Sequence, residues 1–86
     1  MKVVVPSQLR GYTAGQAEVE ATGATLDAVF DDLDRRFPGF RFRVIDEQRR
    51  LRRHILVFLG EHRTDDLDTP VLGHQTVTIV GALSGG

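Results

Sequence analysis

The sequence of 86 residues contains no cysteine, so the chain cannot form a disulfide, a thiolate metal site, a cysteine nucleophile or a cysteine redox centre. It also lacks long apolar runs, and no stretch approaches the ~18 residues that a membrane-spanning helix needs. The apolar start, residues 3–5, is followed at once by Pro6 and is too short for a signal peptide. These absences predict a cytoplasmic protein that does not enter the membrane.

Neither sign of charge is in clear excess. The chain has 11 Lys and Arg residues and 12 Asp and Glu residues, which gives a formal net charge of −1. This balance does not favour nucleic acid, because proteins bind it mainly by neutralising phosphates with basic side chains. One basic run, Arg49-Arg50-Leu51-Arg52-Arg53-His54, could contact phosphate or an acidic partner, but the absence of interleaved aromatic residues favours a solvated loop.

Motifs for bound groups and for catalysis are missing as well. The three histidines, His54, His62 and His74, are scattered and show none of the paired spacings that are typical of a zinc site. The chain has no glycine-rich phosphate-binding loop, so we do not expect it to bind ATP itself. The sequence therefore predicts no metal, no bound cofactor and no enzymatic activity of its own.

What the chain does contain is the composition of one globular domain, with 41% hydrophobic and 27% charged residues. The β-branched run at 3–5 and the alternating run at 16–21 predict two strands that form a hairpin, joined by a loop at 9–15. Thr25 is a suitable N-cap, and the apolar residues that follow it at offsets of three and four predict a helix that ends at Pro38-Gly39. These apolar residues are Leu26, Val29, Phe30, Leu33 and Phe37.

The second half of the chain is rich in strand signals. Residues 54–59 are apolar on both faces and predict a central strand, and residues 76–80 predict another. Between the helix and these strands, the alternation of Phe40, Phe42 and Val44 permits a short strand, followed by a polar loop or hairpin tip. One helix on one face of a mixed sheet is an α+β architecture, and it becomes a β-grasp if the first and last strands pair in parallel. Pattern alone does not give that pairing.

The strand alternation also predicts an apolar outer face of the sheet. If Ile55, Val57 and Leu59 lie under the helix, Leu56 and Phe58 must point away from it. By the same rule Val80 points outward, and Val4 can join the group. An exposed apolar patch of this kind typically marks a protein interface. The alternative is that the segment 40–53 folds over the patch and buries it.

The end of the chain carries a resemblance to a known family. The run Val77-Thr78-Ile79-Val80-Gly81-Ala82-Leu83-Ser84-Gly85-Gly86 resembles the C-terminus of the MoaD/ThiS family of ubiquitin-like sulfur carriers. The likeness extends over most of the chain, through the helix start Thr25-Leu26-Asp27-Ala28-Val29 and the turn Thr69-Pro70-Val71-Leu72-Gly73. It is strongest to the branch with the small subunit of molybdopterin synthase and the CysO-type carriers. The resemblance implies a β-grasp domain over 1–81 and a flexible Gly-Gly tail over 82–86.

The resemblance also implies the chemistry of the tail. In this family an E1-like adenylating enzyme uses ATP to activate the terminal carboxylate, and a sulfur donor then converts it to a thiocarboxylate. Gly86 would be the site of the adenylate and the thiocarboxylate, and Gly85 would thread with it into the partner's active site, because glycine fits a narrow channel. Ser84, Leu83 and Ala82 would complete the threaded tail. The sulfur would pass to a synthase or hydrolase in cofactor, amino-acid or tRNA biosynthesis.

Two other functions stay open. The same activation would serve a ubiquitin-like modifier that is conjugated through Gly86 to a lysine of a target. A third possibility needs no covalent chemistry at all: a β-grasp interaction module with an inert tail. The sequence leaves open which of these applies and which pathway receives the sulfur.

Overall fold

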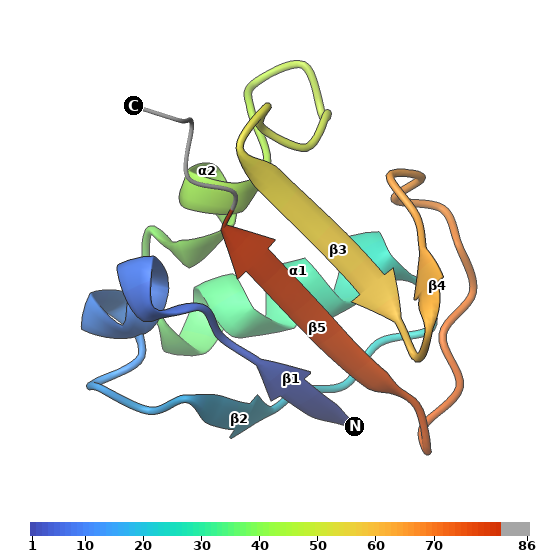
Figure 1. The fold of residues 1–86 in the computed structure, drawn as a ribbon, viewed down its shortest axis with the longest axis horizontal. Coiled ribbons are helices and arrows are strands. Elements are labelled where there is room, and N and C mark those ends of the chain that lie inside the picture. Colours follow the sequence, from blue (N-terminus) through green and yellow to red (C-terminus); the bar gives the residue numbers. More distant parts are fainter. Residues whose placement is uncertain (82–86) are drawn as a thin grey trace.

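The computed structural model describes residues 1–81, which form a five-stranded mixed sheet with a helix across one face (Figure 1). The elements in chain order are β1 (Lys2–Val4), the 3₁₀-helix η1 (Ser7–Tyr12), β2 (Glu18–Glu20), α1 (Leu26–Arg36), α2 (Phe40–Val44), β3 (Ile55–Leu59), β4 (His62–Arg63) and β5 (Thr76–Gly81). The predicted tail, 82–86, lies outside the described residues. None of the helices within residues 1–81 has the length and apolar character to cross a bilayer.

The sheet has the strand order β2-β1-β5-β3-β4 and supplies the pairing that pattern alone did not give. β1 and β5 are parallel, with Val3 opposite Val77, and the β1–β2 hairpin is antiparallel. β3 runs antiparallel to β5 on its other side. The prediction of a β-grasp is confirmed. The prediction that 54–59 is the central strand is wrong in position, because β5 takes the centre and β3 lies next to the two-residue edge strand β4.

The core lies between the sheet and α1. The inward side chains of the strands and the apolar face of α1 are buried, and their burial is the main contribution to stability. They include Val3, Val19, Val57, Val77 and Ile79 from the sheet and Leu26, Val29, Phe30 and Leu33 from the helix.

The helix begins and ends where the sequence predicts. The hydroxyl oxygen of Thr25 accepts a hydrogen bond from the backbone N–H of Ala28 at 3.2 Å, as an N-cap does. Phe37 forms the C-cap, and Gly39 follows with a φ of 94°, a left-handed conformation that favours glycine. Cap, apolar spacing and terminating glycine all point to the same boundaries, which is why this element could be predicted.

The short strand predicted at Phe40, Phe42 and Val44 is wrong, because this segment forms the helix α2. Phe40 and Val44 are four residues apart, so a helix turns both into the core, while Phe42 is left 56% exposed. The carboxylate of Asp34 on α1 accepts hydrogen bonds from the backbone N–H groups of Gly39 and Arg41, which stabilises the first turn of α2. Phe40 and Val44 fit either period, whereas Phe42 fits only that of a strand, and the contact with Asp34 favours the helix.

Three further segments can be compared with the predictions made from the sequence. The loop predicted at 9–15 is in part the 3₁₀-helix η1. The edge strand β4 was not predicted, because its two exposed residues carry no apolar pattern. The hairpin tip after α2 is confirmed by an isolated bridge between Ile45 and Leu51. Inside it, the carboxylate of Asp46 accepts hydrogen bonds from the backbone N–H groups of Gln48 and Arg50.

Candidate functional site: the outer face of the sheet and the start of the tail

The structure shows where the chain enters its predicted reactive tail. The residues predicted to carry the chemistry, Gly86 with Gly85, Ser84, Leu83 and Ala82, lie outside the described part, so their roles stay predictions. Gly81, the last described residue, closes β5 and pairs with Ile55 at the start of β3. The side-chain amide of Gln8 on η1 donates a hydrogen bond to the carbonyl oxygen of Gly81 at 3.3 Å. The tail therefore begins at a fixed point at the end of the central strand.

The outer face of the sheet, opposite α1, carries the side chains that the alternation predicts. Val80 is 37% exposed, and Leu56, Phe58 and Val4 are partly exposed, whereas Ile55, Val57 and Leu59 are buried. The predicted orientation of β3 is therefore confirmed. That this face binds a partner stays a prediction.

The register joins these side chains into one surface. Leu56 lies opposite Val80, and in the next row Val4, Thr78 and Phe58 lie side by side across β1, β5 and β3. Thr78 was missed as a site residue, although the alternation that points Val80 outward also points Thr78 outward. The sequence analysis selected only apolar residues and so omitted the polar one between them.

Charged residues border this surface at both ends of the row. Arg63 on β4 lies opposite Phe58, and Glu18 on β2 lies opposite Val4. The ammonium group of Lys2 lies 3.6 Å from the carboxylate of Glu18. An apolar centre with a polar rim is the usual anatomy of a protein interface.

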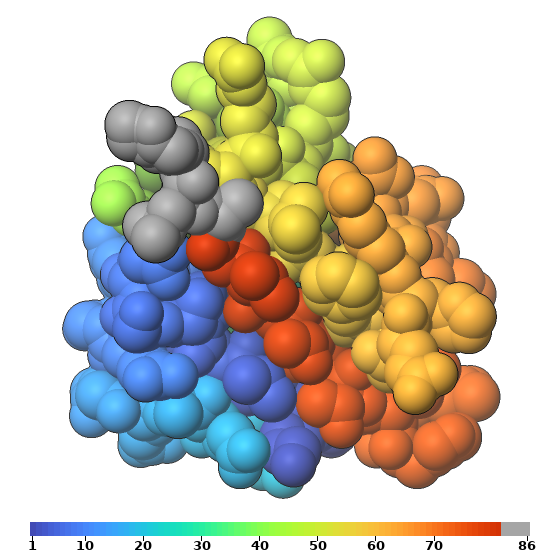
Figure 2. Space-filling view, viewed as in Figure 1, coloured from blue at the N-terminus to red at the C-terminus, as the bar shows by residue number. Residues whose placement is uncertain are grey.

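The alternative in which residues 40–53 cover this face is wrong. α2 packs on α1 and η1, and its apolar side chains, Phe40 and Val44, enter the core from the other side. Figure 2 shows this outer face, in which the atoms of β1, β5 and β3 (blue, red and yellow) are visible at the surface. Among residues 1–81, no group of three or more His, Asp or Glu side chains is placed to hold a metal ion.

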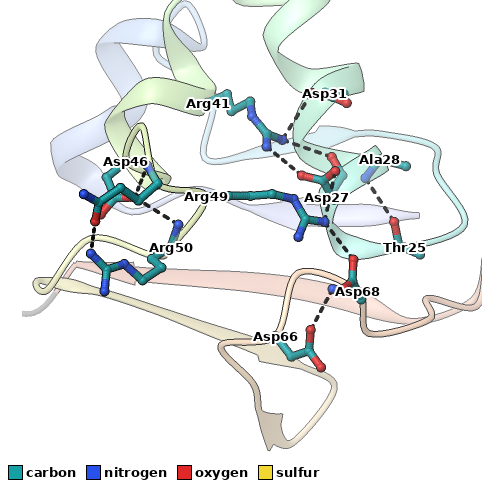
Figure 3. Close-up of polar contacts among 11 residues, drawn as sticks. Thr25, Asp27, Ala28, Asp31, Arg41, Asp46, Arg49, Arg50, Asp66 and Asp68 are labelled. Atoms are coloured by element: carbon teal, nitrogen blue, oxygen red, sulfur yellow. Dashed lines mark hydrogen bonds and ion pairs between the residues drawn. The ribbon is translucent and has the colours of Figure 1, made fainter.

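An ionic cluster lies on the opposite side, at the start of α1 (Figure 3). The carboxylate of Asp27 lies 2.6 Å from the guanidinium of Arg41 and 3.4 Å from that of Arg49, and Arg49 also lies 2.7 Å from Asp68. Partial burial raises the pKa of Asp27, but its hydrogen bonds and charge interactions with the two arginines outweigh this and hold the pKa below the usual 3.8. The cluster ties α2 and the hairpin tip to the helix.

This cluster gives a prediction on stability and pH. Because the folded-state pKa of Asp27 is depressed, its stabilisation is present above about pH 3.8 and is lost as the pH falls through the folded value. Asp27→Asn is expected to lower the free energy of unfolding by about 1–2 kcal/mol at pH 7 and by less as the pH approaches 3. Urea unfolding at several pH values measures this. The control is Asp31→Asn, whose more exposed carboxylate pairs, within residues 1–81, with Arg41 alone. An equal loss in both variants would contradict the assignment.

Comparison with known proteins tests the resemblance to the sulfur-carrier family. No family model matches the chain. The chain is 33% identical over 89 residues to the sulfur carrier protein CysO of Mycobacterium bovis and to that of Mycobacterium tuberculosis, and the match covers 98% of this chain and 96% of each relative.

The chain belongs to the MoaD/ThiS family of ubiquitin-like sulfur carriers. The solved structures agree with this membership. A crystal structure of the Amycolatopsis orientalis BexX/CysO complex matches with 34% identity and a TM-score of 0.90, covering 99% of this chain and 98% of that chain. Mycobacterium tuberculosis CysO matches with 31% identity and a TM-score of 0.89, over 95% of this chain and 98% of that one. A sulfur carrier is a protein substrate of other enzymes, in agreement with the prediction that the chain is not an enzyme.

A third structure shows the shared fold alone. SAMP1 of Haloferax volcanii has a TM-score of 0.78 at 24% identity and covers 100% of this chain and 98% of that chain. The β-grasp fold is therefore kept even where little sequence is shared. In this chain the features that keep it are the parallel β1–β5 pair and the buried face of α1.

Proposed function

We propose that this chain carries sulfur as a thiocarboxylate at the carboxyl group of Gly86. The observation that supports the proposal most is its near full-length similarity to the CysO sulfur carriers. The position of Gly85-Gly86 in the sequence also supports it, since the two glycines are the last residues of a tail that follows directly on β5, the central strand. In this proposal the folded domain presents the tail, and enzymes that bind the domain perform the reactions.

The proposed reaction has two steps. A carboxylate oxygen of Gly86 attacks the α-phosphorus of ATP, pyrophosphate leaves, and an acyl-adenylate forms. Sulfide then attacks the acyl carbon, the carbon–oxygen bond to AMP breaks, and AMP leaves with the bonding electron pair, so that the terminus holds a thiocarboxylate. Five extended residues reach ~17 Å at ~3.3–3.6 Å each, which is enough to bring Gly86 from β5 into an active site in a partner.

The chemistry requires partners that supply what this chain lacks. An E1-like adenylating enzyme binds ATP and receives the sulfur donor, and a synthase or hydrolase accepts the sulfur. The outer face of the sheet is the proposed docking surface for these partners, through Leu56, Phe58, Val80 and Val4. ATP is the energy source of the first step, so we place the reaction in the cytoplasm. The similarity to CysO favours cysteine biosynthesis over molybdopterin biosynthesis as the pathway to test first.

Intact-mass spectrometry tests the proposal. The purified chain is incubated with the adenylating enzyme encoded in the same genome, ATP and a sulfide source. The expected result is a mass increase equal to the replacement of one oxygen by one sulfur, located by fragmentation at Gly86. The control is a chain without Gly85 and Gly86, which should gain nothing.

The same experiment separates the alternatives. Adducts that join Gly86 to lysine side chains of other proteins would support the ubiquitin-like modifier. An unchanged mass with every adenylating enzyme of that genome, together with full activity in cells of the chain that lacks Gly85-Gly86, would overturn both covalent functions. The non-covalent β-grasp module would then be the remaining function.

A further inference from the structure

We use the name basic rim for three arginines, Arg43, Arg52 and Arg53, each of which lies on or against an element next to Gly81. Ile55, the partner of Gly81 in the sheet, donates its backbone N–H to the carbonyl oxygen of Arg52 at 2.9 Å. On the other side, the guanidinium of Arg43 lies 5.6 Å from the ring centroid of Tyr12 on η1. η1 also carries Gln8, which binds Gly81. In Figure 1 the end of β5 accordingly lies between η1 and the start of β3.

The basic rim differs from Arg41 and Arg49 of the same segment. Residues 40–54 contain six arginines and two carboxylates, in a chain whose net charge is −1. Arg41 and Arg49 are neutralised by Asp27, Asp31 and Asp68. Within residues 1–81, Arg43, Arg52 and Arg53 form no ion pair with any carboxylate. Arg50 also forms no ion pair in this part of the chain, and its guanidinium donates a hydrogen bond to the side-chain oxygen of Gln48. Arg41 and Arg49 therefore stabilise the fold, while the rim arginines are free to pair with carboxylates of a partner.

Two of the rim arginines are held in place rather than fully solvated. The guanidinium carbon of Arg52 lies 4.5 Å from the ring centroid of Phe42, and its Nε donates a hydrogen bond to the carbonyl oxygen of Phe42 at 2.6 Å. Phe42 itself is 56% exposed, which is unusual for so large an apolar side chain. Arginine and aromatic side chains are enriched in the binding hot spots of interfaces, and a fixed side chain loses less entropy on binding.

A hollow lined by two of the rim arginines, Arg52 and Arg53, has the chemistry to receive a carboxylate. It is lined by Asp46, Arg50, Leu51, Arg52, Arg53 and His54. The carboxylate of Asp46 is turned to the loop itself, where it accepts the backbone N–H groups of Gln48 and Arg50. The remaining charged groups of the lining are basic.

We propose that the basic rim binds an acidic surface of the enzyme that adenylates Gly86. This inference rests on the proposed function and extends it, because it adds an electrostatic contact to the apolar one on the outer face of the sheet. Contact at the rim would orient the start of the tail toward the active site, and opposite charges on the two proteins would accelerate their association. A protein surface fits better than nucleic acid, because the rim is small and the net charge of the whole chain is negative.

The test is the association rate constant of the full chain with the adenylating enzyme of the same genome, measured by stopped flow at several salt concentrations. Arg53 is exposed, and its side chain forms no hydrogen bond or ion pair within the described residues, so Arg53→Glu should leave the fold intact. The matched control is Arg35→Glu, which makes the same charge change on α1 at a side chain that is 76% exposed. We expect Arg53→Glu to slow association about tenfold at low salt and to flatten its salt dependence, while Arg35→Glu stays close to wild type.

Two outcomes would overturn the inference. If Arg53→Glu and Arg43→Glu both associate at the wild-type rate, the rim does not contact the enzyme. If Arg35→Glu slows association as much as Arg53→Glu, only the net charge matters. Unfolding temperatures show whether each variant is folded, and Arg53→Gln, which removes the charge without reversing it, replaces Arg53→Glu if that variant is not. Failure of the wild-type chain to form a thiocarboxylate would instead contradict the proposed function, so the two failures are distinguishable.

Discussion

Replacement of Phe58 by alanine is expected to weaken binding to the adenylating enzyme by about 30-fold to 1,000-fold, the loss of about 2–4 kcal/mol that an aromatic hot spot contributes. Phe58 is the largest side chain on the outer face, and it lies in the row with Thr78 and Val4 next to the pair of Leu56 and Val80. Its ring is partly exposed in the free chain, so a partner can bury the part of the ring that water still reaches. Isothermal titration calorimetry with the enzyme and no ATP measures the dissociation constant.

A matched control separates binding from a general loss of apolar surface. Leu72 is 57% exposed, and it lies in the segment before β5, outside the outer face of the sheet. Leu72→Ala should leave the dissociation constant within a few-fold of wild type, whereas Phe58→Ala should not. Thermal unfolding of both variants checks that the chain stays folded. A dissociation constant for Phe58→Ala equal to that of Leu72→Ala would show that partners bind elsewhere.

The outer face was predictable because a strand has a fixed two-residue period. Once Ile55, Val57 and Leu59 lie under α1, no freedom is left for Leu56 and Phe58, which must point outward. The helix was predictable for a similar reason, since Thr25, the spacing of the apolar residues and Gly39 agree on its limits. Local signals that support each other are sufficient to predict these elements.

The elements that were missed depend on contacts between distant residues. α2 is favoured by the hydrogen bonds of Asp34 to its first turn and by the burial of Phe40 and Val44, none of which a local period reveals. The central place of β5 follows from its parallel pairing with β1, at the other end of the chain. For the basic run Arg49 to His54 the sequence favours a solvated loop, because Phe42, the aromatic partner of Arg52, lies outside the run.

The largest expected effect on stability comes from Gly23, which precedes α1 and passes close to its backbone. A Cβ atom added at Gly23 would lie 2.6 Å from the backbone nitrogen of Val29 and 2.8 Å from the carbonyl carbon of Ala28. These atoms belong to a hydrogen-bonded helix and cannot move aside as a flexible side chain does. Gly23→Ala must therefore displace the chain before Thr25, whose hydroxyl caps the helix.

We expect Gly23→Ala to lower the free energy of unfolding by about 2–3 kcal/mol, a large part of the roughly 5–15 kcal/mol that stabilises a typical domain. For a chain of this size the unfolding temperature should fall by roughly 10–20 °C. The control is Gly11→Ala on η1, where an added Cβ has no atom within 4 Å and the change should stay within about 0.5 kcal/mol. Calorimetric scans of both variants measure the difference. Equal unfolding temperatures would mean that the segment 22–25 can shift at no cost, and that the close approach of Gly23 to α1 does not hold the start of the helix.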